Sequence, residues 1–340
     1  MDSTYKLFIL ENCLSAEDLL FIQDNNFLEI QGRRYSDVNI VGGLQDISLC
    51  NTSSLIISNN NYKNIDINYF LLQSENRNSC VVNYNDNSTN NLFWIDPSFK
   101  FKKLISKNEQ YVDGYFISGV FLIQEELVNL DLFDFSIEKV ISENFSFIPL
   151  PICNNQYTGV NTEPVLFLDR DGIINIDKGY VHKISEIEWI EETSHLMKWW
   201  IGLGRKIVIL TNQSGIARGM YSIKELNELH QEMNKFLQSN GINIFQWEYC
   251  PYHTKGTVDK YAKNSLLRKP NPGMLLKAGE NIQIDFQKSF MIGDNITDQL
   301  LTGIKSLIIR GRHVRSRAKG ELIFDSISDA TDYIKHLKYS

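Results

Sequence analysis

Residues 165–172 read Val-Leu-Phe-Leu-Asp-Arg-Asp-Gly, and this stretch decides the fold. Its first part is a continuous apolar run, which is typical of a short strand buried on both faces of a parallel sheet. Two acids and a glycine follow directly, at the carboxyl end of the predicted strand. Ligands of open α/β sheets bind beyond the carboxyl ends of the strands. The stretch therefore predicts an α/β fold and also the position of its functional site.

Further apolar runs in the C-terminal half predict the other strands of the same sheet. They lie at residues 207–210, 290–292, 307–309 and 322–324. A helix is expected after Ser222, which can form a capping box with Glu225, and Gly241 offers a left-handed stop. A last helix is expected at 329–337. Strands that alternate with amphipathic helices indicate a Rossmann-like, three-layer parallel sheet.

Polar residues directly after these runs, or between them, are the candidate site. They are Asp169, Asp171, Thr211, Asn212, Lys269, Asp294 and Asp298. Several of these residues could instead have a purely structural role: Thr211 and Asn212 could cap the next helix, and Lys269 could be a solvated surface lysine. Their order along the chain favours convergence on one edge of the sheet.

This set of side chains suits phosphoryl transfer through an aspartyl-phosphate. Asp169 and Asp171 are two residues apart, so an extended backbone points both to one side. One can attack phosphorus while the other protonates the leaving oxygen. Crowded carboxylates repel a phosphate, so a hard cation is required, and Mg²⁺ held by Asp169 and Asp294 would supply it. Hydrogen-bond donors and a balancing charge would come from Thr211, Asn212 and Lys269.

Four stretches carry a resemblance to a known family: 168–172 (LDRDG), 179–182 (GYVH), 211–219 (TNQSGIARG) and 268–274 (RKPNPGM). With them, residues 164 to about 338 resemble the haloacid dehalogenase superfamily. Within it, the segment is similar to bacterial D-glycero-D-manno-heptose 1,7-bisphosphate 7-phosphatases and histidinol-phosphatases. The resemblance implies a domain over 164–340 that lacks a large cap domain and takes its specificity from loops.

The same resemblance implies roles for individual residues. Asp169 would be the nucleophile and Asp171 the general acid/base, with Lys269 stabilising charge. Mg²⁺ would bind Asp169, Asp294 and the backbone carbonyl of Asp171. Asp298 is expected to orient these groups without binding the ion directly, or to be a helix-start acid. Arg268 is implied as a substrate contact. The remaining candidates for phosphate or substrate contacts are Gln213, His182 and Arg218, the last two of which could equally be surface residues.

One loop departs from the family pattern. Relatives usually bind zinc there through Cys-x-His and Cys-x-Cys, but this chain has Cys250-Pro251-Tyr252 and, further on, 265–267 (SLL). Cys250, with His253 displaced by one position, cannot complete a tetrahedral zinc site. We therefore expect no structural zinc and a loop held by packing of tyrosines, namely Tyr249, Tyr252 and Tyr261.

The first 150 residues are rich in Asn and Ser and predict strands at 54–57, 115–117 and 120–123. They faintly resemble sugar-1-phosphate nucleotidyltransferases, but an Asn stands where a metal-binding Asp is expected and the glycine-rich nucleotide loop is missing. We interpret 1–150 as a smaller α/β domain, a degenerate and catalytically inactive transferase remnant that serves association or sugar binding. Residues 151–163 are expected to form a linker.

Composition limits the possible functions. The chain has 340 residues, 43% apolar and 22% charged, with a net charge of −7. This balance is ordinary for a globular protein and disfavours broad binding to nucleic acid or anionic membranes. No apolar run is long enough to span a bilayer, and no secretion signal is visible. Five scattered cysteines make a disulfide framework improbable and suggest a reducing cytoplasm.

We therefore predict a Mg²⁺-dependent phosphomonoesterase that removes the 7-phosphate of a heptose bisphosphate in nucleotide-heptose synthesis for lipopolysaccharide, capsule or surface glycan. The expected partner is a small phosphorylated sugar, without nucleic acid or membrane, and the oligomeric state is open. One alternative is a phosphatase for histidinol phosphate, another small sugar or a nucleic-acid end. A second alternative is a non-catalytic assembly or regulatory module built on a decayed enzyme. The basic residues at 310–319 are expected to be a solvated loop.

Overall fold

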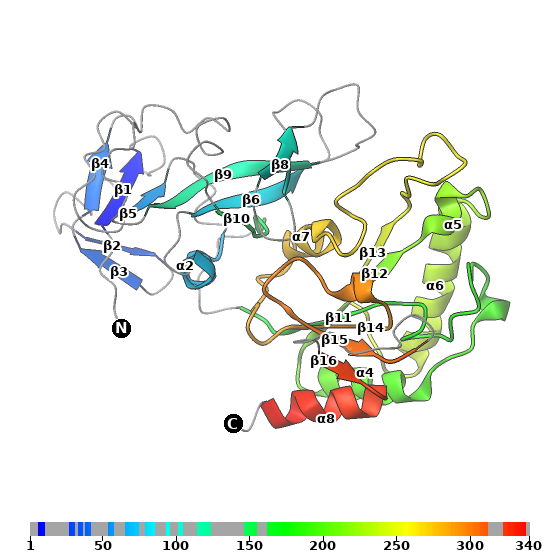
Figure 1. Cartoon of the computed structure of the whole chain (residues 1–340). Helices are drawn as coiled ribbons and strands as arrows, with labels where there is room; N and C mark the ends of the chain where they lie inside the picture. Colours follow the sequence, from blue (N-terminus) through cyan, green and yellow to red (C-terminus); the bar gives the residue numbers. More distant parts are fainter. Residues whose placement is uncertain are drawn as a thin grey trace. The chain divides into compact units, whose positions relative to one another are not determined.

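The computed structural model (Figure 1) describes residues 6–10, 27–30, 33–36, 38–41, 54–57, 65–74, 79–85, 93–95, 101–104, 114–123, 146–154, 162–311 and 322–337. The chain divides into two compact units. The first comprises Met1–Glu109, Asp113–Thr162 and Gly279–Gln283, and the second comprises Gln110–Val112, Glu163–Ala278 and Ile284–Ser340. Each unit has its own sheet.

The C-terminal unit is built on a six-stranded, fully parallel sheet in the order β13-β12-β11-β14-β15-β16. The strands are β11 (Val165–Leu168), β12 (Lys206–Asn212), β13 (Gln246–Cys250), β14 (Phe290–Gly293), β15 (Lys305–Ile309) and β16 (Leu322–Phe324). Every residue of β11 and β14 is buried, as expected for strands covered on both faces. The sheet is therefore a rigid support for the loops that carry the predicted site residues.

Helices of this unit connect the strands. They are α4 (Glu191–Gly202), α5 (Ser214–Ala217), α6 (Ile223–Ser239), α7 (Gly273–Gly279) and α8 (Ile327–Leu337), with 3₁₀ turns η4 (Ile184–Glu186) and η5 (Ile296–Asp298). Helix α6 begins as predicted: the Ser222 hydroxyl accepts a hydrogen bond from the Glu225 N–H, and the Glu225 carboxylate accepts one from the Ser222 N–H. Gly241, with φ of +76°, lies just past its end.

The main core lies between one face of the sheet and three of these helices. Helices α4 and α8 pack against each other on that face (Figure 1), and the apolar face of α6 belongs to the same core. The largest fully buried side chain is Trp200 of α4, whose indole N–H donates to the Lys206 carbonyl at 2.9 Å. Apolar helix faces buried in this way supply most of the stability of such a unit.

The N-terminal unit has a mixed sheet. Strand β1 (Lys6–Leu10) pairs in parallel with its neighbours, and the long β9 (Gly114–Ile123) is antiparallel to both strands beside it. The sheet order is β10-β6-β9-β5-β1-β4; outside this order β7 pairs with β8 and β9, and β2 and β3 form a separate pair. The other elements are β2 (Phe27–Ile30), β3 (Arg33–Ser36), β4 (Val38–Val41), β5 (Ser54–Ile57), α2 (Ile67–Ser74), β6 (Ser79–Asn85), β7 (Phe93–Ile95), β8 (Phe101–Leu104) and β10 (Ser146–Pro149).

Most strand predictions are confirmed. The runs at 165–168, 207–210, 290–292, 307–309 and 322–324 all lie in strands, and β5 occupies 54–57. The two runs predicted at 115–117 and 120–123 form one strand, β9, which pairs with β5 only over its second run and whose register against β6 shifts between the two runs. The sequence patterns missed β13, α4 and α7. Of the basic cluster at 310–319, Arg310 is exposed and residues 312–319 lie outside the described residues.

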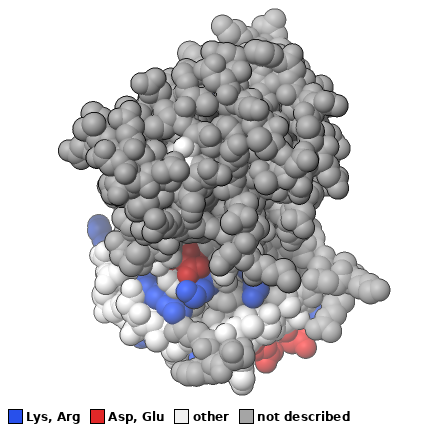
Figure 2. Space-filling model, turned by 90° about the vertical axis from the view of Figure 1, so that its left-hand side faces the viewer, with Lys and Arg blue, Asp and Glu red and all other residues white. Residues whose placement is uncertain are grey.

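Charges of both signs lie together on the surface. In the face drawn in Figure 2, the Lys and Arg side chains of the described residues lie beside Asp and Glu side chains. Among the described residues, the helices lack the length and apolar content that would let one cross a membrane. The cysteines at 80, 153 and 250 are buried free thiols.

Candidate active site

The predicted site residues meet where the strand order of the C-terminal sheet reverses. From the central strand β11 the chain proceeds to β12 and β13 on one side, and then crosses back to β14 on the other side. Asp169 follows β11, and its N–H donates to the Ile292 carbonyl of β14 at 2.9 Å. Thr211 lies near the end of β12, and Asp294 follows β14. A reversal of this kind leaves a crevice at the carboxyl edge, which is where ligands of α/β sheets bind.

Three carboxylates form a cluster at this edge. One oxygen of each of Asp169, Asp294 and Asp298 lies within 4.8 Å of the others. The Lys269 ammonium is 2.9 Å from Asp169 Oδ1 and 2.5 Å from Asp298 Oδ1, and both Lys269 and Asp298 are buried. With all four groups ionised the cluster carries a net negative charge, which favours binding of a cation.

The donor set fits a hard divalent cation. Only oxygen atoms are offered, and oxygens on opposite sides of Mg²⁺ or Ca²⁺ are about 4–5 Å apart. Asp298 uses both of its oxygens on protein donors, because Oδ1 pairs with Lys269 and Oδ2 accepts the Asn295 N–H at 3.0 Å. Asp169 and Asp294 are therefore better placed as metal ligands, and Asp298 holds Lys269.

Gly172 brings the backbone close to the Asp294 carboxylate. Its φ is +84°, and a Cβ at this position would lie 2.2 Å from Asp294 Oδ2. An L-residue side chain fits neither this backbone conformation nor this contact. The glycine therefore lets the loop after β11 pass directly over a candidate metal ligand.

Burial and the neighbouring charges set the protonation of the two central groups. Burial raises the pKa of Asp169 to about 8; Lys269 opposes this increase, whereas the charges of Asp298 and Asp171 add to it. Burial alone would lower the pKa of Lys269, but the pairs with Asp169 and Asp298 outweigh it and raise that pKa. Lys269 is thus a cation, and further positive charge beside Asp169 would favour its carboxylate form.

The Asp171 carboxylate is fixed by donors from three side chains. The Arg170 guanidinium donates to both oxygens, with Nη2 at 2.7 Å from Oδ2 and 2.9 Å from Oδ1. Asn175 Nδ2 donates to Oδ1 at 3.0 Å, and Gln213 Nε2 donates to Oδ2 at 3.1 Å. The Asp171 side chain still exposes 23% of its surface, so it can reach a substrate.

Asn212 connects two of the site loops. Its side-chain Oδ1 accepts the Lys269 N–H at 3.1 Å, and its Nδ2 donates to the Lys269 carbonyl at 3.4 Å. In the structure this side chain holds the backbone of Lys269, and its contact with phosphate stays a prediction. Thr211 is buried, and its hydroxyl accepts a hydrogen bond from Gln213 Nε2 at 2.8 Å.

Two arginines lie on the loops beside these groups. Arg218 follows α5, and its Nε is buried without a hydrogen-bond acceptor. Burial lowers the pKa of Arg268, and the charge of Arg218 lowers it further. Burial also lowers the pKa of His253, in the same direction as the charges of Arg268 and Arg218. These neighbouring cationic groups form a candidate anion site.

Comparison with known proteins identifies the family. A profile of the family described as polynucleotide kinase 3 phosphatase matches residues 165–317. The D-glycero-beta-D-manno-heptose-1,7-bisphosphate 7-phosphatase of Photorhabdus laumondii subsp. laumondii is 40% identical over 182 residues, which cover 52% of this chain and 97% of that protein. The chain belongs to the family of this heptose-bisphosphate 7-phosphatase.

Other matches cover the same C-terminal half. The Escherichia coli K12 protein of the same name is 35% identical over 179 residues, which cover 51% of this chain and 94% of that protein. A crystal structure of D,D-heptose 1,7-bisphosphate phosphatase from B. bronchiseptica, complexed with magnesium and phosphate, has a TM-score of 0.43 at 21% identity. That match covers 52% of this chain and 99% of the other chain. The relatives at 35–40% identity are named as phosphatases, which are phosphoric monoester hydrolases.

The loop that departs from the family pattern is held by aromatic and backbone contacts. Cys250 is buried, and its Sγ lies 3.6 Å from the Tyr252 carbonyl. The rings of Tyr252 and Tyr261 have centroids 5.9 Å apart, and Tyr249 and Tyr261 pack against a small cluster around Tyr221. Within the described residues, the three aspartates are the only grouping of three or more metal-ligating side chains. That this loop binds no zinc stays a prediction.

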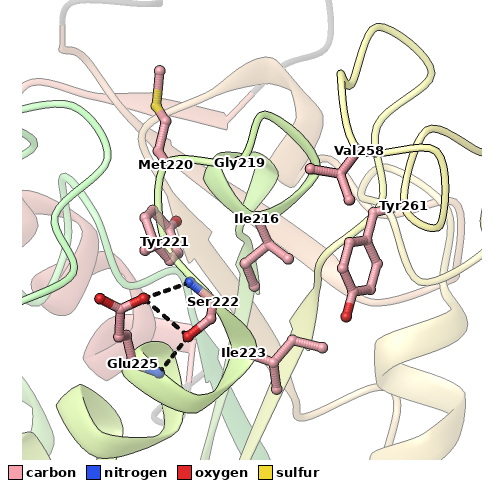
Figure 3. A pocket seen from close by; sticks show the side chains of 9 residues that line it. All are labelled: Ile216, Gly219, Met220, Tyr221, Ser222, Ile223, Glu225, Val258 and Tyr261. Carbon is pink, nitrogen blue, oxygen red and sulfur yellow. Dashed lines mark hydrogen bonds between the residues drawn. The ribbon is translucent and has the colours of Figure 1, made fainter.

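A hollow of about 410 Å³ lies beside this loop (Figure 3). Its walls come from the α5–α6 connection on one side and from Val258 and Tyr261 on the other. The remaining lining residues are Ile216, Gly219, Met220, Tyr221, Ser222, Ile223 and Glu225. The hollow therefore lies between the altered loop and the start of α6, and Tyr221, which lines it, also contacts Gln213 of the candidate site.

The sequence missed several side chains of the site. Tyr221 donates its hydroxyl proton to Gln213 Oε1, and its ring stacks on His182 with centroids 5.1 Å apart. His182 thus contacts the site through Tyr221. Arg170 and Asn175 were also not singled out, although an arginine between two acids is a signal that could have been noticed. Each of these residues contacts Gln213 or Asp171, either directly or through Tyr221.

Proposed function

We propose that this chain removes the 7-phosphate of D-glycero-D-manno-heptose 1,7-bisphosphate, with Asp169 as the nucleophile. The observation that carries the proposal is the cluster of Asp169, Asp294 and Asp298 around buried Lys269 at the carboxyl edge of the sheet. Similarity to phosphatases named for this substrate supports the choice of sugar. The product would feed nucleotide-heptose synthesis for surface polysaccharide.

In the first step, an Asp169 carboxylate oxygen attacks phosphorus and the bond from phosphorus to the sugar oxygen breaks. Asp171 gives its proton to that leaving oxygen. In the second step, Asp171 takes a proton from water, whose oxygen attacks phosphorus, and the bond to Asp169 breaks to release inorganic phosphate. Lys269 stays 2.9 Å from Asp169 Oδ1 and can neutralise charge that develops on the transferred group.

Asp169, Asp294 and the backbone carbonyl of Asp171 would hold Mg²⁺. When bound, the ion offsets repulsion between the carboxylates and the phosphate and polarises a phosphoryl oxygen. Asp298 keeps Lys269 oriented and stands outside the ligand set, because both of its oxygens are engaged. Thr211 would donate its hydroxyl proton to a phosphoryl oxygen.

The second phosphate of the substrate would bind Arg268 and Arg218. Both guanidinium groups lie on loops beside the site, and Arg218 has a buried Nε without an acceptor. A phosphate matches the hydrogen-bonding fork of arginine and would relieve the mutual repulsion. His182, whose ring stacks on Tyr221, would contact the sugar of the substrate. Gln213, whose amide donates to Asp171, would contact it too. We place the protein in the cytoplasm, in agreement with its free thiols at Cys80, Cys153 and Cys250.

For the N-terminal unit we propose a non-catalytic role in association or sugar binding. Its sheet combines parallel pairs with a long antiparallel strand, β9, and it is separate from the sheet that carries the catalytic acids. The transferase ancestry that the sequence suggests stays a prediction.

Phosphate release from matched substrates tests the proposed function. The full chain with Mg²⁺ is assayed on heptose 1,7-bisphosphate in both anomers, histidinol phosphate and a 3′-phosphorylated oligonucleotide, with Asp169→Asn as the inactive control. We expect the bisphosphate to have the highest kcat/KM. Arg268→Met should raise KM for the bisphosphate and leave a simple monophosphate almost unaffected.

Other outcomes would favour the alternatives. The oligonucleotide is included because the matching profile is named for a polynucleotide 3-phosphatase. Preference for it would replace the sugar substrate, and preference for histidinol phosphate would do the same. No turnover of any of these esters, with a folded protein and added Mg²⁺, would favour a non-catalytic assembly or regulatory module.

A further inference from the structure

Arg170, the residue between the two catalytic aspartates, is fully buried although it carries a charge. A buried guanidinium is unfavourable unless its donors and its charge are satisfied. The neighbours of Arg170 meet both requirements. Its main partner is the general acid/base itself: Nη2 and Nε donate to Asp171, the latter to Oδ1 at 3.2 Å.

We propose that Arg170 is a positioning residue that holds the Asp171 carboxylate in the orientation required for proton transfer. This inference rests on the proposed function, because it assigns Asp171 the role of proton donor. The contact engages both carboxylate oxygens, so it restrains rotation of the carboxyl group as well as its distance.

The guanidinium is itself held by neighbours that accept hydrogen bonds. Its Nη2 donates to the Val181 carbonyl at 2.7 Å, and its Nη1 lies 3.4 Å from His230 Nε2. Burial, with the charge of Arg170, lowers the pKa of His230 to about 3, so the ring is neutral and can accept a hydrogen bond. The ring of His230 in turn stacks on Trp247, with centroids 4.6 Å apart. Arg170 is thus also held by acceptors other than Asp171.

Two amides fix the carboxylate from other directions. Asn175 donates to Oδ1, and Gln213 donates to Oδ2. The orientation of the Gln213 amide is fixed, since its oxygen accepts the Tyr221 hydroxyl and its nitrogen also donates to Thr211. Arg170 is the only one of these donors that contacts both oxygens of Asp171, so its loss should disturb the carboxylate most.

The test exploits the leaving group. A sugar oxygen must be protonated as it leaves, whereas the nitrophenolate of p-nitrophenyl phosphate leaves well without a proton. The ratio kcat/KM reports the steps up to release of the first product, so it isolates this protonation. General acid–base catalysis contributes roughly 10²–10⁴-fold. For Arg170→Lys, which keeps the charge and loses the fork, we expect kcat/KM on heptose bisphosphate to fall about 10- to 100-fold and on p-nitrophenyl phosphate less than about threefold.

A second variant and a double mutant guard against a folding defect. His230→Leu leaves Arg170 in place and removes its acceptor, and it should show the same selective loss in weaker form. In an Asp171→Asn background, Arg170→Lys should cause little additional loss, because a positioning residue acts only through its partner. Far-UV circular dichroism and the Tm of each variant are measured in parallel.

The outcomes separate the two proposals. Equal losses on both phosphate esters, or an undiminished effect of Arg170→Lys in the Asp171→Asn background, would show a merely structural arginine and overturn this inference alone. An unmodified chain without activity on either ester would overturn the proposed function and this inference with it.

Discussion

Replacement of Lys269 by methionine should destabilise the C-terminal unit far more than replacement of an exposed lysine with an equally short ion pair. Lys269 lies 2.9 Å from Asp169 and exposes 1% of its side chain, whereas Lys288 lies 3.0 Å from Asp285 and exposes 70%. Loss of one partner of a buried pair typically costs about 3–5 kcal/mol, and loss of an exposed pair costs up to about 1 kcal/mol. The contrast between the two lysines therefore compares a buried lysine held by two carboxylates with an exposed lysine held by one.

The assay is thermal unfolding followed by tryptophan fluorescence in EDTA. Four of the five tryptophans lie in the C-terminal unit, at positions 189, 199, 200 and 247, so the signal reports mainly on it. With roughly 2–4 °C per kcal/mol for a unit of this size, Lys269→Met should lower the Tm by roughly 6–20 °C and Lys288→Met by at most a few degrees. Added Mg²⁺ should reduce the first loss, because it replaces the missing positive charge.

The same variant should lose activity with Mg²⁺ present, by about 10²–10³-fold in kcat, because a charge that stabilises the transition state is removed. If Lys269→Met and Lys288→Met unfold at the same temperature in EDTA, the buried cluster does not contribute the free energy of unfolding that we assign to it. Unchanged kcat in Lys269→Met would refute the catalytic role of the lysine.

Three further predictions concern the metal, the loop after β11 and a helix end. The pKa of Asp169 is raised to about 8 in the fold, so the metal-free protein loses stability as pH rises from about 4 to 8. Because Mg²⁺ would bind the carboxylate form of Asp169, it should raise the Tm more at pH 8 than at pH 5.5, and a pH-independent increase would contradict this ion site. Gly172→Ala, which places a Cβ 2.2 Å from Asp294 and strains the backbone, should abolish Mg²⁺-dependent turnover, and wild-type kcat in that variant would argue against the close approach. Ser222→Ala removes the cap of α6 and should cost about 1 kcal/mol in urea unfolding while kcat is unchanged, whereas no loss of stability would mean that the capping box does not contribute.

The sequence predicted the sheet and the position of the acids at its carboxyl edge because both depend on local patterns. Buried strands such as Val165–Leu168 are continuous apolar runs, and the polar residues after them have to lie at one edge of a parallel sheet. The strand Gln246–Cys250 was missed because it is an edge strand, half-buried over most of its length, and carries polar residues. Its pattern therefore lacks the apolar run by which the other strands were found.

Side-chain partners in the site could be predicted only in part. The roles of Asp298 and Asn212 depend on contacts with Lys269 across the fold, and nothing in their local sequence specifies which atom they bind. The restraint of Asp171 by Arg170 also depends on distant acceptors, the carbonyl of Val181 and the ring of His230. Contacts of this kind form only when the strands and loops are assembled.

The most direct test of the central claim is detection of a phosphoryl group on Asp169. The full chain is mixed with heptose bisphosphate and Mg²⁺, quenched in acid within a single turnover, digested and analysed by mass spectrometry. We predict that the peptide containing Asp169 carries one phosphoryl group, that EDTA prevents its formation, and that Asp169→Asn has none. Rapid phosphate release without any phosphorylated Asp169 peptide at early times would contradict the covalent mechanism.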